Sequence, residues 1–219
     1  MSDSIADRLI KFYARNDRSV TINAAQGHFA TSHSHTNYYI DVTRIKVRIS
    51  EAKQAAVFLK GQLENQVETI DTIVCLDETQ VIGAFLGELV EKSGFIVNHK
   101  LHDTTYVIRP EMNSIGQFMF RENNRLAIEG KSVLVLVDSM TTGDTVKQAL
   151  ECISYYGGTV CGIASIFSTI DYVDETRVFT IFDQEDLPGY SAYEPHECPM
   201  CKNGMQIDAM VNGYGYAKL

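Results

Sequence analysis

The sequence predicts an α/β fold in which helices flank a mainly parallel central sheet. Apolar, largely β-branched runs at Ile70–Leu76 and Val133–Val137 have the composition of strands buried on both faces. The segments Gln80–Lys92 and Val146–Tyr156, which come after these runs, space their apolar residues as amphipathic helices do. Strands that alternate with helices indicate a parallel sheet covered on both faces, and 219 residues suffice to bury its core.

The remaining elements follow from local patterns. Before the first buried strand we expect a short amphipathic helix over 4–13, strands over 20–30 and 38–42 around a polar turn, and a helix from Ser50 to Leu63. Gly94 should end the helix Gln80–Lys92. Further strands are expected at Phe95–Asn98, Thr104–Ile108, Thr159–Phe167 and Val178–Phe182, with a loop over 109–131 and an irregular tail from Asp183.

Composition excludes several classes of function. The net charge of −9 and the sequence pI near 5.1 argue against a general nucleic-acid binder or a membrane-surface protein. No apolar run reaches the length of a membrane span, and the first residues do not form a signal peptide. Five cysteines in such a chain indicate reduced thiols and a cytoplasmic location.

A candidate phosphate site lies where the strand Val133–Val137 should leave the sheet. Asp138 follows the strand, and a hydroxyl-rich turn with one glycine leads into the next helix. Backbone N–H groups at such a helix N-terminus favour an anion, and a glycine lets the backbone approach it closely. An ordinary capped turn is the alternative, but it does not explain the acid and the Thr-Thr-Gly sequence together. The proposed phosphate-binding residues are Ser139, Met140, Thr141, Thr142, Gly143, Asp144 and Thr145.

This stretch resembles the phosphoribosyl-diphosphate (PRPP) motif of type I phosphoribosyltransferases. The chain as a whole is most similar to orotate phosphoribosyltransferases, since Gly27–Asp41 is similar to their N-terminal signature and Cys198–Gly204 to a tail of longer members. The resemblance implies a single domain with a core over about 50–182 and a small hood from about 1–45 and 183–219. It also implies a homodimer that uses PRPP with Mg²⁺ and a nitrogenous base, orotate first, with neither nucleic acid nor membrane as partner.

The resemblance also assigns roles to individual residues. Asp138 would face the ribose hydroxyls or the metal, and Arg109 would be catalytic within a lid over 109–130. The loop that binds the diphosphate would consist of Asp77, Glu78, Thr79 and Gln80. The base pocket would consist of Phe29, His35, Tyr38 and Thr169. Arg121 and Arg125 would be further cations of the lid.

Several positions depart from the family pattern. Val137 stands where a second acid is usual, Pro110 and Asn113 stand where lysines are usual, and Thr169 stands where an arginine usually reads orotate. These changes leave two alternatives open beside an orotate transferase. One is a sensor of PRPP or a nucleotide that no longer catalyses transfer, and the other is a transferase for a different base.

Two groups of metal-binding residue types remain. His28, His33 and His35 lie close in sequence and could bind a metal or replace lost cations around a substrate anion, but we expect at least His28 to be a polar residue of an exposed turn. Cys198 and Cys201 form one CxxC pair, which we expect to be reduced and free of metal. The alternative is a zinc ion held by this pair and His196. We favour the metal-free pair over it, because a structural zinc needs four ligands and no second cysteine pair lies at suitable spacing.

Overall fold

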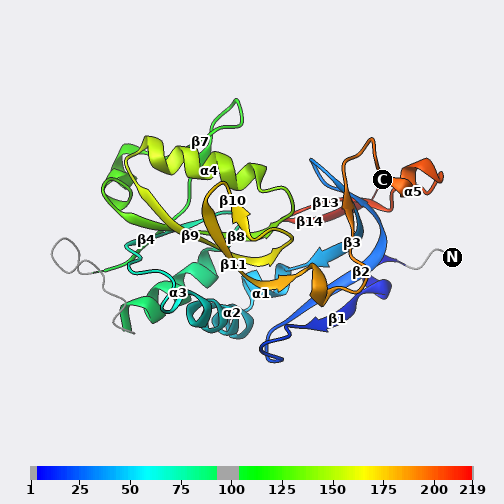
Figure 1. Cartoon of the computed structure of the whole chain (residues 1–219), viewed down its shortest axis with the longest axis horizontal. Coiled ribbons are helices and arrows are strands. Elements are labelled where there is room, and N and C mark those ends of the chain that lie inside the picture. The colour runs from blue at the N-terminus through cyan, green and yellow to red at the C-terminus, as the bar shows by residue number, and fades with distance from the viewer. Residues whose placement is uncertain (1–3, 93–103, 219) are drawn as a thin grey trace.

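The computed structural model describes residues 4–92 and 104–218, which form two six-stranded sheets side by side and a separate two-stranded sheet (Figure 1). The first six-stranded sheet, here called the core sheet, has five parallel strands and one antiparallel edge strand, β10. Its order is β10 (Tyr172–Val173), β11 (Thr176–Asp183), β9 (Thr159–Ser168), β8 (Ser132–Met140), β4 (Thr72–Cys75) and β5 (Tyr106–Ile108). The prediction of a mainly parallel α/β sheet is therefore confirmed.

Helices cover both faces of the core sheet, as Figure 1 shows. Side chains of β8 alternate between the two faces: Leu134 and Leu136 pack with α2 (Ile49–Leu63) and α3 (Gln80–Lys92), whereas Val133 and Val135 pack with α4 (Asp144–Tyr155). A strand that is buried on both faces has to be apolar at every position, which is why its sequence shows no polar alternation. The predicted helices Gln80–Lys92 and Ser50–Leu63 are confirmed to within one residue.

The second sheet, here called the hood sheet, joins both ends of the chain. Its order is β12 (Ala192–Tyr193), β3 (His35–Asp41), β2 (Thr21–Ala30), β13 (Ala209–Asn212) and β14 (Gly215–Lys218), and β1 (Ile10–Tyr13) pairs with β2. The two strands predicted near 20–30 and 38–42 are thus confirmed. In Figure 1 the β13–β14 hairpin reaches from the hood sheet toward β8 of the core sheet.

The helix predicted over 4–13 is wrong beyond its first turn. A capping box between Ser4 and Asp7 starts the 3₁₀ turn η1 (Ile5–Arg8), and the chain then continues as β1. Four residues of β1 pair antiparallel with Thr21–Ala24 of β2. The ladder offered by β2 overrides a helical pattern of only ten residues, because a helix of that length is marginal without tertiary support.

Two segments predicted to be irregular have more structure than expected. The loop over 109–131 contains the hairpin of β6 (Glu111–Met112) and β7 (Phe118–Met119), followed by η2 (Glu122–Ala127). The tail after Asp183 contains η3 (Gln184–Asp186), β12, α5 (Pro199–Lys202), β13 and β14. Sequence also missed α1 (Thr43–Val47). The predicted strand Phe95–Asn98 and the stop at Gly94 lie outside the described residues.

None of the helices described for residues 4–92 and 104–218 combines the length with the apolar character that crossing a bilayer demands.

Candidate functional site

The order of strands in the core sheet creates a crevice at the carboxyl ends of β4 and β8. The chain passes from β4 outward to β5 and then returns to β8 on the other side of β4. Ligands of open parallel sheets bind at such a switch point, where the loops on the two sides diverge. The loop after β4 supplies Asp77, and the end of β8 supplies Asp138.

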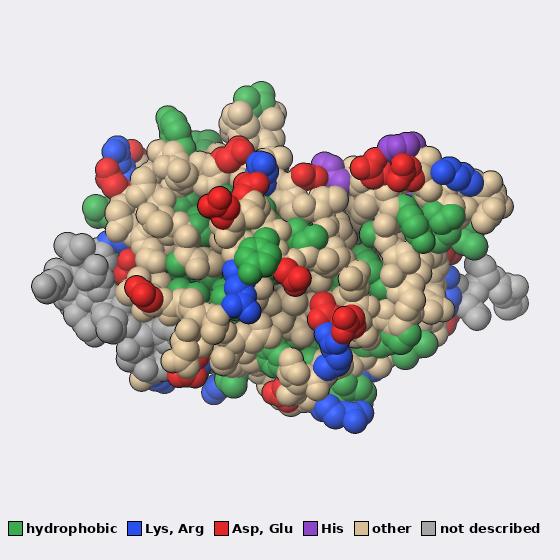
Figure 2. All heavy atoms as spheres, in the orientation of Figure 1, with side chains coloured by type: hydrophobic (Ala, Val, Ile, Leu, Met, Phe, Trp, Pro, Cys, Tyr) green, Lys and Arg blue, Asp and Glu red, His purple; other side chains and the backbone are tan. Residues whose placement is uncertain are grey.

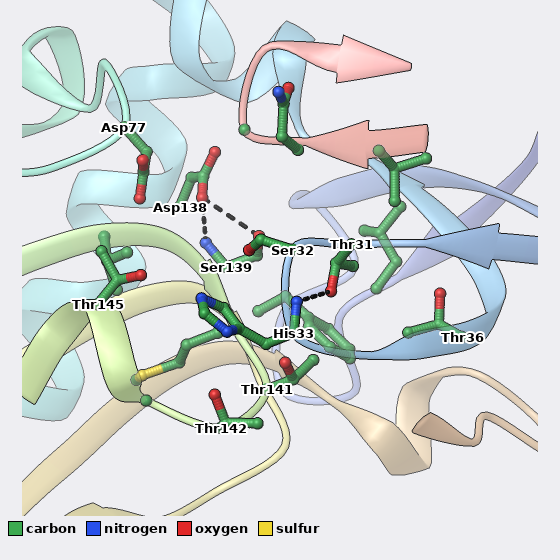
Figure 3. A pocket seen from close by; sticks show the side chains of 18 of the residues that line it. Thr31, Ser32, His33, Thr36, Asp77, Asp138, Ser139, Thr141, Thr142 and Thr145 are labelled. Atoms are coloured by element: carbon green, nitrogen blue, oxygen red, sulfur yellow. Dashed lines mark hydrogen bonds between the residues drawn. The ribbon is translucent and has the colours of Figure 1, made fainter. Parts of the chain in front are cut away.

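A cavity of about 240 Å³ occupies this crevice and extends under the hood sheet. Its core side consists of Asp77 and the continuous stretch Val137–Val146, together with Phe167. The hood side consists of Thr31, Ser32, His33, Thr36, Tyr38, Tyr39, Ile40, Tyr190, Val211, Asn212 and Gly213. Figure 3 shows the labelled hydroxyl and carboxylate side chains of both sides converging on this space.

The stretch Ser139–Thr145, proposed as the phosphate site, lines the cavity at every position. Gly143 has φ +81° and stands as the N-cap of α4, so no side chain covers the N–H groups that begin the helix. A Cβ at this position would lie 3.0 Å from Ile170 Cδ1 and from Val173 Cγ2. The turn therefore requires glycine at position 143 for two reasons, the positive φ and the lack of space for a Cβ. The uncapped N-terminus leaves the positive end of the α4 dipole facing the cavity.

Hydroxyl groups fix the shape of this turn. Thr142 Oγ1 donates to Asp144 Oδ2 at 2.8 Å, and Thr169 Oγ1 donates to the Thr141 carbonyl at 2.9 Å. Thr169, which we assigned to the base pocket, does not line the cavity but supports the turn from the neighbouring β9 side. The turn is thus held in place before any ligand arrives.

Asp138 is buried and ion-paired, which the sequence did not reveal. Its Oδ2 lies 2.7 Å from the Nζ of Lys46, and both side chains are at most 3% exposed. Lys46 Nζ also donates to the Asp77 carbonyl at 2.9 Å and to the Gly213 carbonyl at 2.5 Å. Lys46 therefore joins the β4 loop, the end of β8 and the C-terminal hairpin. Nothing in the local sequence around Lys46 distinguishes it from a surface lysine of a short helix.

The loop after β4 has a strained backbone at the cavity. Asp77 and Glu78 have φ of +48° and +61°, a region that residues with a side chain rarely adopt. Of the four residues proposed for a diphosphate loop, Asp77 lines the cavity. Glu78 is exposed, Thr79 is buried with its hydroxyl on the carbonyls of Leu76 and Leu136, and Gln80 begins α3.

The surroundings of the Asp77 carboxyl favour its protonated form. Burial first, and then the nearby Asp138 and Glu78 carboxylates, raise the pKa of Asp77 against the opposing effect of Lys46, and together these causes bring it to about 6. Negative charge is therefore in excess around Asp77. Carboxylate oxygens in such a place suit a hard divalent cation, so the donor set of Asp77 and Asp138 fits Mg²⁺ bound together with ligand oxygens.

The hood side offers aromatic rings and hydroxyls. Tyr38 lines the cavity and stacks on Tyr190 with ring centroids 6.2 Å apart. His33 extends from the β2–β3 turn toward Thr141 and Thr142, as Figure 3 shows. The acidic side chains among the described residues of the lining are those of Asp77, Asp138 and Asp144. The same described lining contains no Lys and no Arg.

Two residues assigned to the base pocket lie elsewhere. Phe29 is fully buried behind the cavity and packs against Tyr39, with ring centroids 6.0 Å apart. His35 Nδ1 faces Cys201 Sγ at 3.2 Å and does not line the cavity. His33 takes the place at the cavity that we had assigned to His35.

The arginines proposed for a lid do not line the cavity. Arg109 is exposed beyond β5. Arg121 is bound to Glu111 across the β6–β7 hairpin, with Nη2 2.7 Å from Oε2, and Arg125 of η2 pairs with Glu129, which lies just beyond η2. In Figure 1 this hairpin projects beyond α4 at the top of the molecule.

The cysteine pair has partners other than the predicted one. Cys198 and Cys201 lie against His28 and His35, whereas His196 is 73% exposed and lies near Glu194 and Glu197. His28 is fully buried, so the expectation of an exposed turn residue is wrong. The β2–β3 pairing placed both histidines beside the tail, a long-range arrangement that sequence spacing does not show.

Comparison with known proteins places the chain among distant relatives. No family model matches it. The orotate phosphoribosyltransferase of Sulfurimonas denitrificans is 26% identical over 193 residues, which are 83% of this chain and 89% of that protein. The orotate phosphoribosyltransferase of Thermotoga maritima is 31% identical over 112 residues, 48% of this chain and 58% of that protein. The chain is thus distantly homologous to orotate phosphoribosyltransferases over most of its length.

Solved structures give the same fold. The orotate phosphoribosyltransferase of Aeropyrum pernix aligns with a TM-score of 0.50 at 15% identity, covering 74% of this chain and 88% of that one. The UMP synthase of Leishmania donovani aligns with a TM-score of 0.53 at 16% identity over 75% of this chain, which spans only 34% of that longer chain. The chain has the type I phosphoribosyltransferase fold.

Proposed function

We propose that the chain is a PRPP-dependent phosphoribosyltransferase of the orotate type, which forms a pyrimidine nucleotide and pyrophosphate. The observation that carries the proposal is the turn Ser139–Thr145, which lines a cavity opposite aromatic and hydroxyl side chains at the switch point of the core sheet. Such a cavity can hold a phosphate at one end and a planar base at the other. The distant homologues, which are named orotate phosphoribosyltransferases, support the same reaction.

Different residues of the cavity bind different parts of PRPP. N–H groups and hydroxyls of the turn bind the 5′-phosphate, Asp138 faces the ribose hydroxyls, and Asp77 faces the diphosphate side with Mg²⁺. In the reaction the bond from C1′ to pyrophosphate breaks and a bond from C1′ to a base nitrogen forms. Mg²⁺ would neutralise charge on the leaving pyrophosphate. The chain's own contribution is to hold both reactants in line in a preformed cavity.

The cavity restricts how a base can be recognised. Because the described lining holds no Lys or Arg, the carboxylate of orotate would have to bind His33, hydroxyls of Thr31 and Ser32, or backbone N–H groups. Such partners favour a carboxylate less strongly than a guanidinium does. We therefore propose orotate as the first base to test and uracil, which has no carboxylate, as its matched comparison.

We propose further that the active form is a homodimer. Arg109, Arg121 and Arg125 lie on a projecting hairpin and its flanks, away from the cavity of their own chain. A hairpin in this position can carry cations into the cavity of a second copy, which would close the site over the diphosphate.

One observation favours a second function. Lys46 already neutralises Asp138 inside the protein, and Val137 stands beside it in place of a second acid. A site with these features can bind PRPP or a nucleotide without activating it. The second candidate is therefore a sensor that binds the ligand and does not transfer the phosphoribosyl group.

Titration calorimetry separates these functions. PRPP is titrated into the protein with Mg²⁺, and orotate or uracil is then added while pyrophosphate release is followed by a coupled assay. Release with either base establishes the transferase and identifies its base, whereas binding without release favours the sensor or a transferase for another base. Absence of PRPP binding would refute the transferase and a PRPP sensor. The variant Asp138→Asn should lose release in the transferase, measured on protein whose melting curve shows that it is folded.

A further inference from the structure

Four side chains from three elements meet in the hood sheet, at a place that plays no part in the reaction proposed above. His28 comes from β2, His35 begins β3, and Cys198 and Cys201 flank the first turn of α5. One ligand atom from each lies within 4.8 Å of all the others. His28 and Cys198 are fully buried, and Cys201 is exposed.

The spacing of these atoms agrees with a tetrahedral zinc site. Zn–N bonds of about 2.0–2.1 Å and Zn–S bonds of about 2.3 Å put neighbouring ligand atoms about 3.3 Å apart for two nitrogens and about 3.5 Å apart for nitrogen and sulfur. Here His28 Nε2 lies 3.1 Å from His35 Nδ1 and 3.6 Å from each of the two sulfurs. Cys201 Sγ lies 3.2 Å from His35 Nδ1.

The surroundings of His28 orient its ring for metal binding. Its Nδ1 lies 3.0 Å from the Met205 carbonyl, an acceptor, so the proton belongs on Nδ1 and the lone pair of Nε2 faces the cluster. Metal-bound histidines are commonly held in this way by a backbone carbonyl. Gly204, with φ +74°, turns the chain after α5 so that Met205 returns to this position.

The local geometry explains why these residues meet. His28 and His35 are diagonal neighbours on the β2–β3 ladder, because His35 pairs with Ala30. The CxxC pair spans one turn of α5, which puts both sulfurs on one side. The Asp208 side chain accepts from the backbone N–H of His28 at 2.9 Å and pairs with Arg8, and this fixes the tail just beyond α5 against β2.

We propose that His28, His35, Cys198 and Cys201 bind one Zn²⁺ in a closed structural site. Binding releases two thiol protons, so two thiolates and two neutral imidazoles leave the site without net charge. Four protein ligands leave no open position for chemistry. The role of the ion is to join the tail to β2 and β3.

The proposed zinc site connects two segments that line the cavity. The turn between the two histidine ligands contains Thr31, Ser32 and His33, which line the cavity. The tail beyond the cysteine ligands forms β13 and reaches Gly213, whose carbonyl accepts from Lys46. Loss of the ion should therefore loosen both walls, whichever base the site accepts.

Metal analysis of the purified full chain tests the proposal. Mass spectrometry of the dissolved metals should find about one zinc per chain, and Cys201→Ser and His35→Ala should each reduce it at least about tenfold. His196→Ala and His33→Ala are matched controls that should keep the zinc. Cys201 is exposed, so its serine variant disturbs the fold least. If His35→Ala does not fold, the Cys201→Ser result stands on its own.

A second measurement reports the ligand set directly. Protein prepared with Co²⁺ should show the visible absorption of a tetrahedral site and a thiolate charge-transfer band, both absent from Cys201→Ser. Chelation should lower the melting temperature on the order of 5–10 °C. The proposal is overturned by purified protein that holds no zinc and takes up neither Zn²⁺ nor Co²⁺. Intact-mass evidence for a Cys198–Cys201 disulfide in freshly purified protein would overturn it equally.

Discussion

Lys46 connects three separate segments through its contacts with Asp77, Asp138 and Gly213. A lysine that is 3% exposed is favourable only if its charge is matched, and here Asp138 and two carbonyls surround its ammonium group. Gly213 has to be glycine for the same reason, since a Cβ there would lie 2.8 Å from Asp138 Oδ2. The Lys46–Asp138 pair therefore fixes the position of the β13–β14 hairpin over the cavity.

Removing the ammonium group should be costly for folding. Lys46→Met leaves the Asp138 carboxylate buried without its counter-charge, so we expect the free energy of unfolding in urea to fall by about 3–5 kcal/mol. Lys147→Met, which breaks the exposed pair with Asp174, is the control and should change it by no more than about 1 kcal/mol. The double variant Lys46→Met/Asp138→Asn should recover part of the loss. Equal effects of Lys46→Met and Lys147→Met would contradict a buried pair.

Asp77 should make stability depend on pH. Its pKa is about 6 in the folded protein against an ordinary 3.8, so the folded state binds the proton more tightly than the unfolded state. The stability that this proton contributes is complete below pH 3.8 and is lost as pH rises through 6. Asp77→Asn, which tolerates the positive φ, should gain on the order of 2 kcal/mol relative to the wild type between pH 4 and pH 7.5 without ligand. Parallel stability curves from urea unfolding would refute this.

At the scale of elements, local sequence predicted the core sheet and its helices well. Strands such as β8 are buried on both faces and therefore uniformly apolar, and the helix Gln80–Lys92 shows its buried face at regular spacing. The turn Ser139–Thr145 could also be predicted, because strand, acid, glycine and helix are adjacent in the chain. These features need only neighbours in sequence.

Elements that depend on distant partners could not be predicted in this way. β12 is a strand because it pairs with β3, which lies about 156 residues earlier, and β13, besides its hairpin with the adjacent β14, lies parallel to β2 although about 180 residues separate them. The same reason hid Lys46 and the His28–Cys201 cluster. Each of these contacts joins residues that no local pattern connects. His35, which we assigned to the base pocket, faces Cys201 instead. The resemblance therefore indicated the region of the site but not the direction of this side chain.

The turn Ser139–Thr145 allows a test in which the control glycine has the same φ. Gly143 and Gly116 both have φ +81°, but a Cβ would contact Ile170 and Val173 only at Gly143, while at Gly116 it meets open space. Both alanine variants bear a backbone cost of about 1 kcal/mol. Gly143→Ala should in addition weaken PRPP binding at least about tenfold, since the turn must move. Calorimetry that finds equal PRPP affinity in both variants would exclude the turn as the phosphate site.

At the scale of the whole molecule, the cavity exists because the two sheets meet. The core sheet alone provides the turn and the acids, and the hood sheet alone provides the rings and hydroxyls. On the face drawn in Figure 2, acidic and basic side chains are interspersed and form no continuous basic stripe. With a net charge of −9, the protein should attract a polyphosphate through backbone N–H groups and a bound cation rather than through its overall field.

The position of the β6–β7 hairpin makes a prediction about assembly. If Arg109 acts in the cavity of a second copy, Arg109→Ala and Asp138→Asn should each abolish pyrophosphate release as homodimers. In a mixed dimer one cavity keeps its own Asp138 and receives Arg109 from the other chain. Unfolding and refolding the two variants together in equal amounts should then restore about a quarter of the wild-type rate, since half of the dimers are mixed and each has one complete site. Mixing two preparations of the same variant is the control and should restore nothing. If the joint refolding also restores nothing while a dimer is present, Arg109 does not act across the dimer interface.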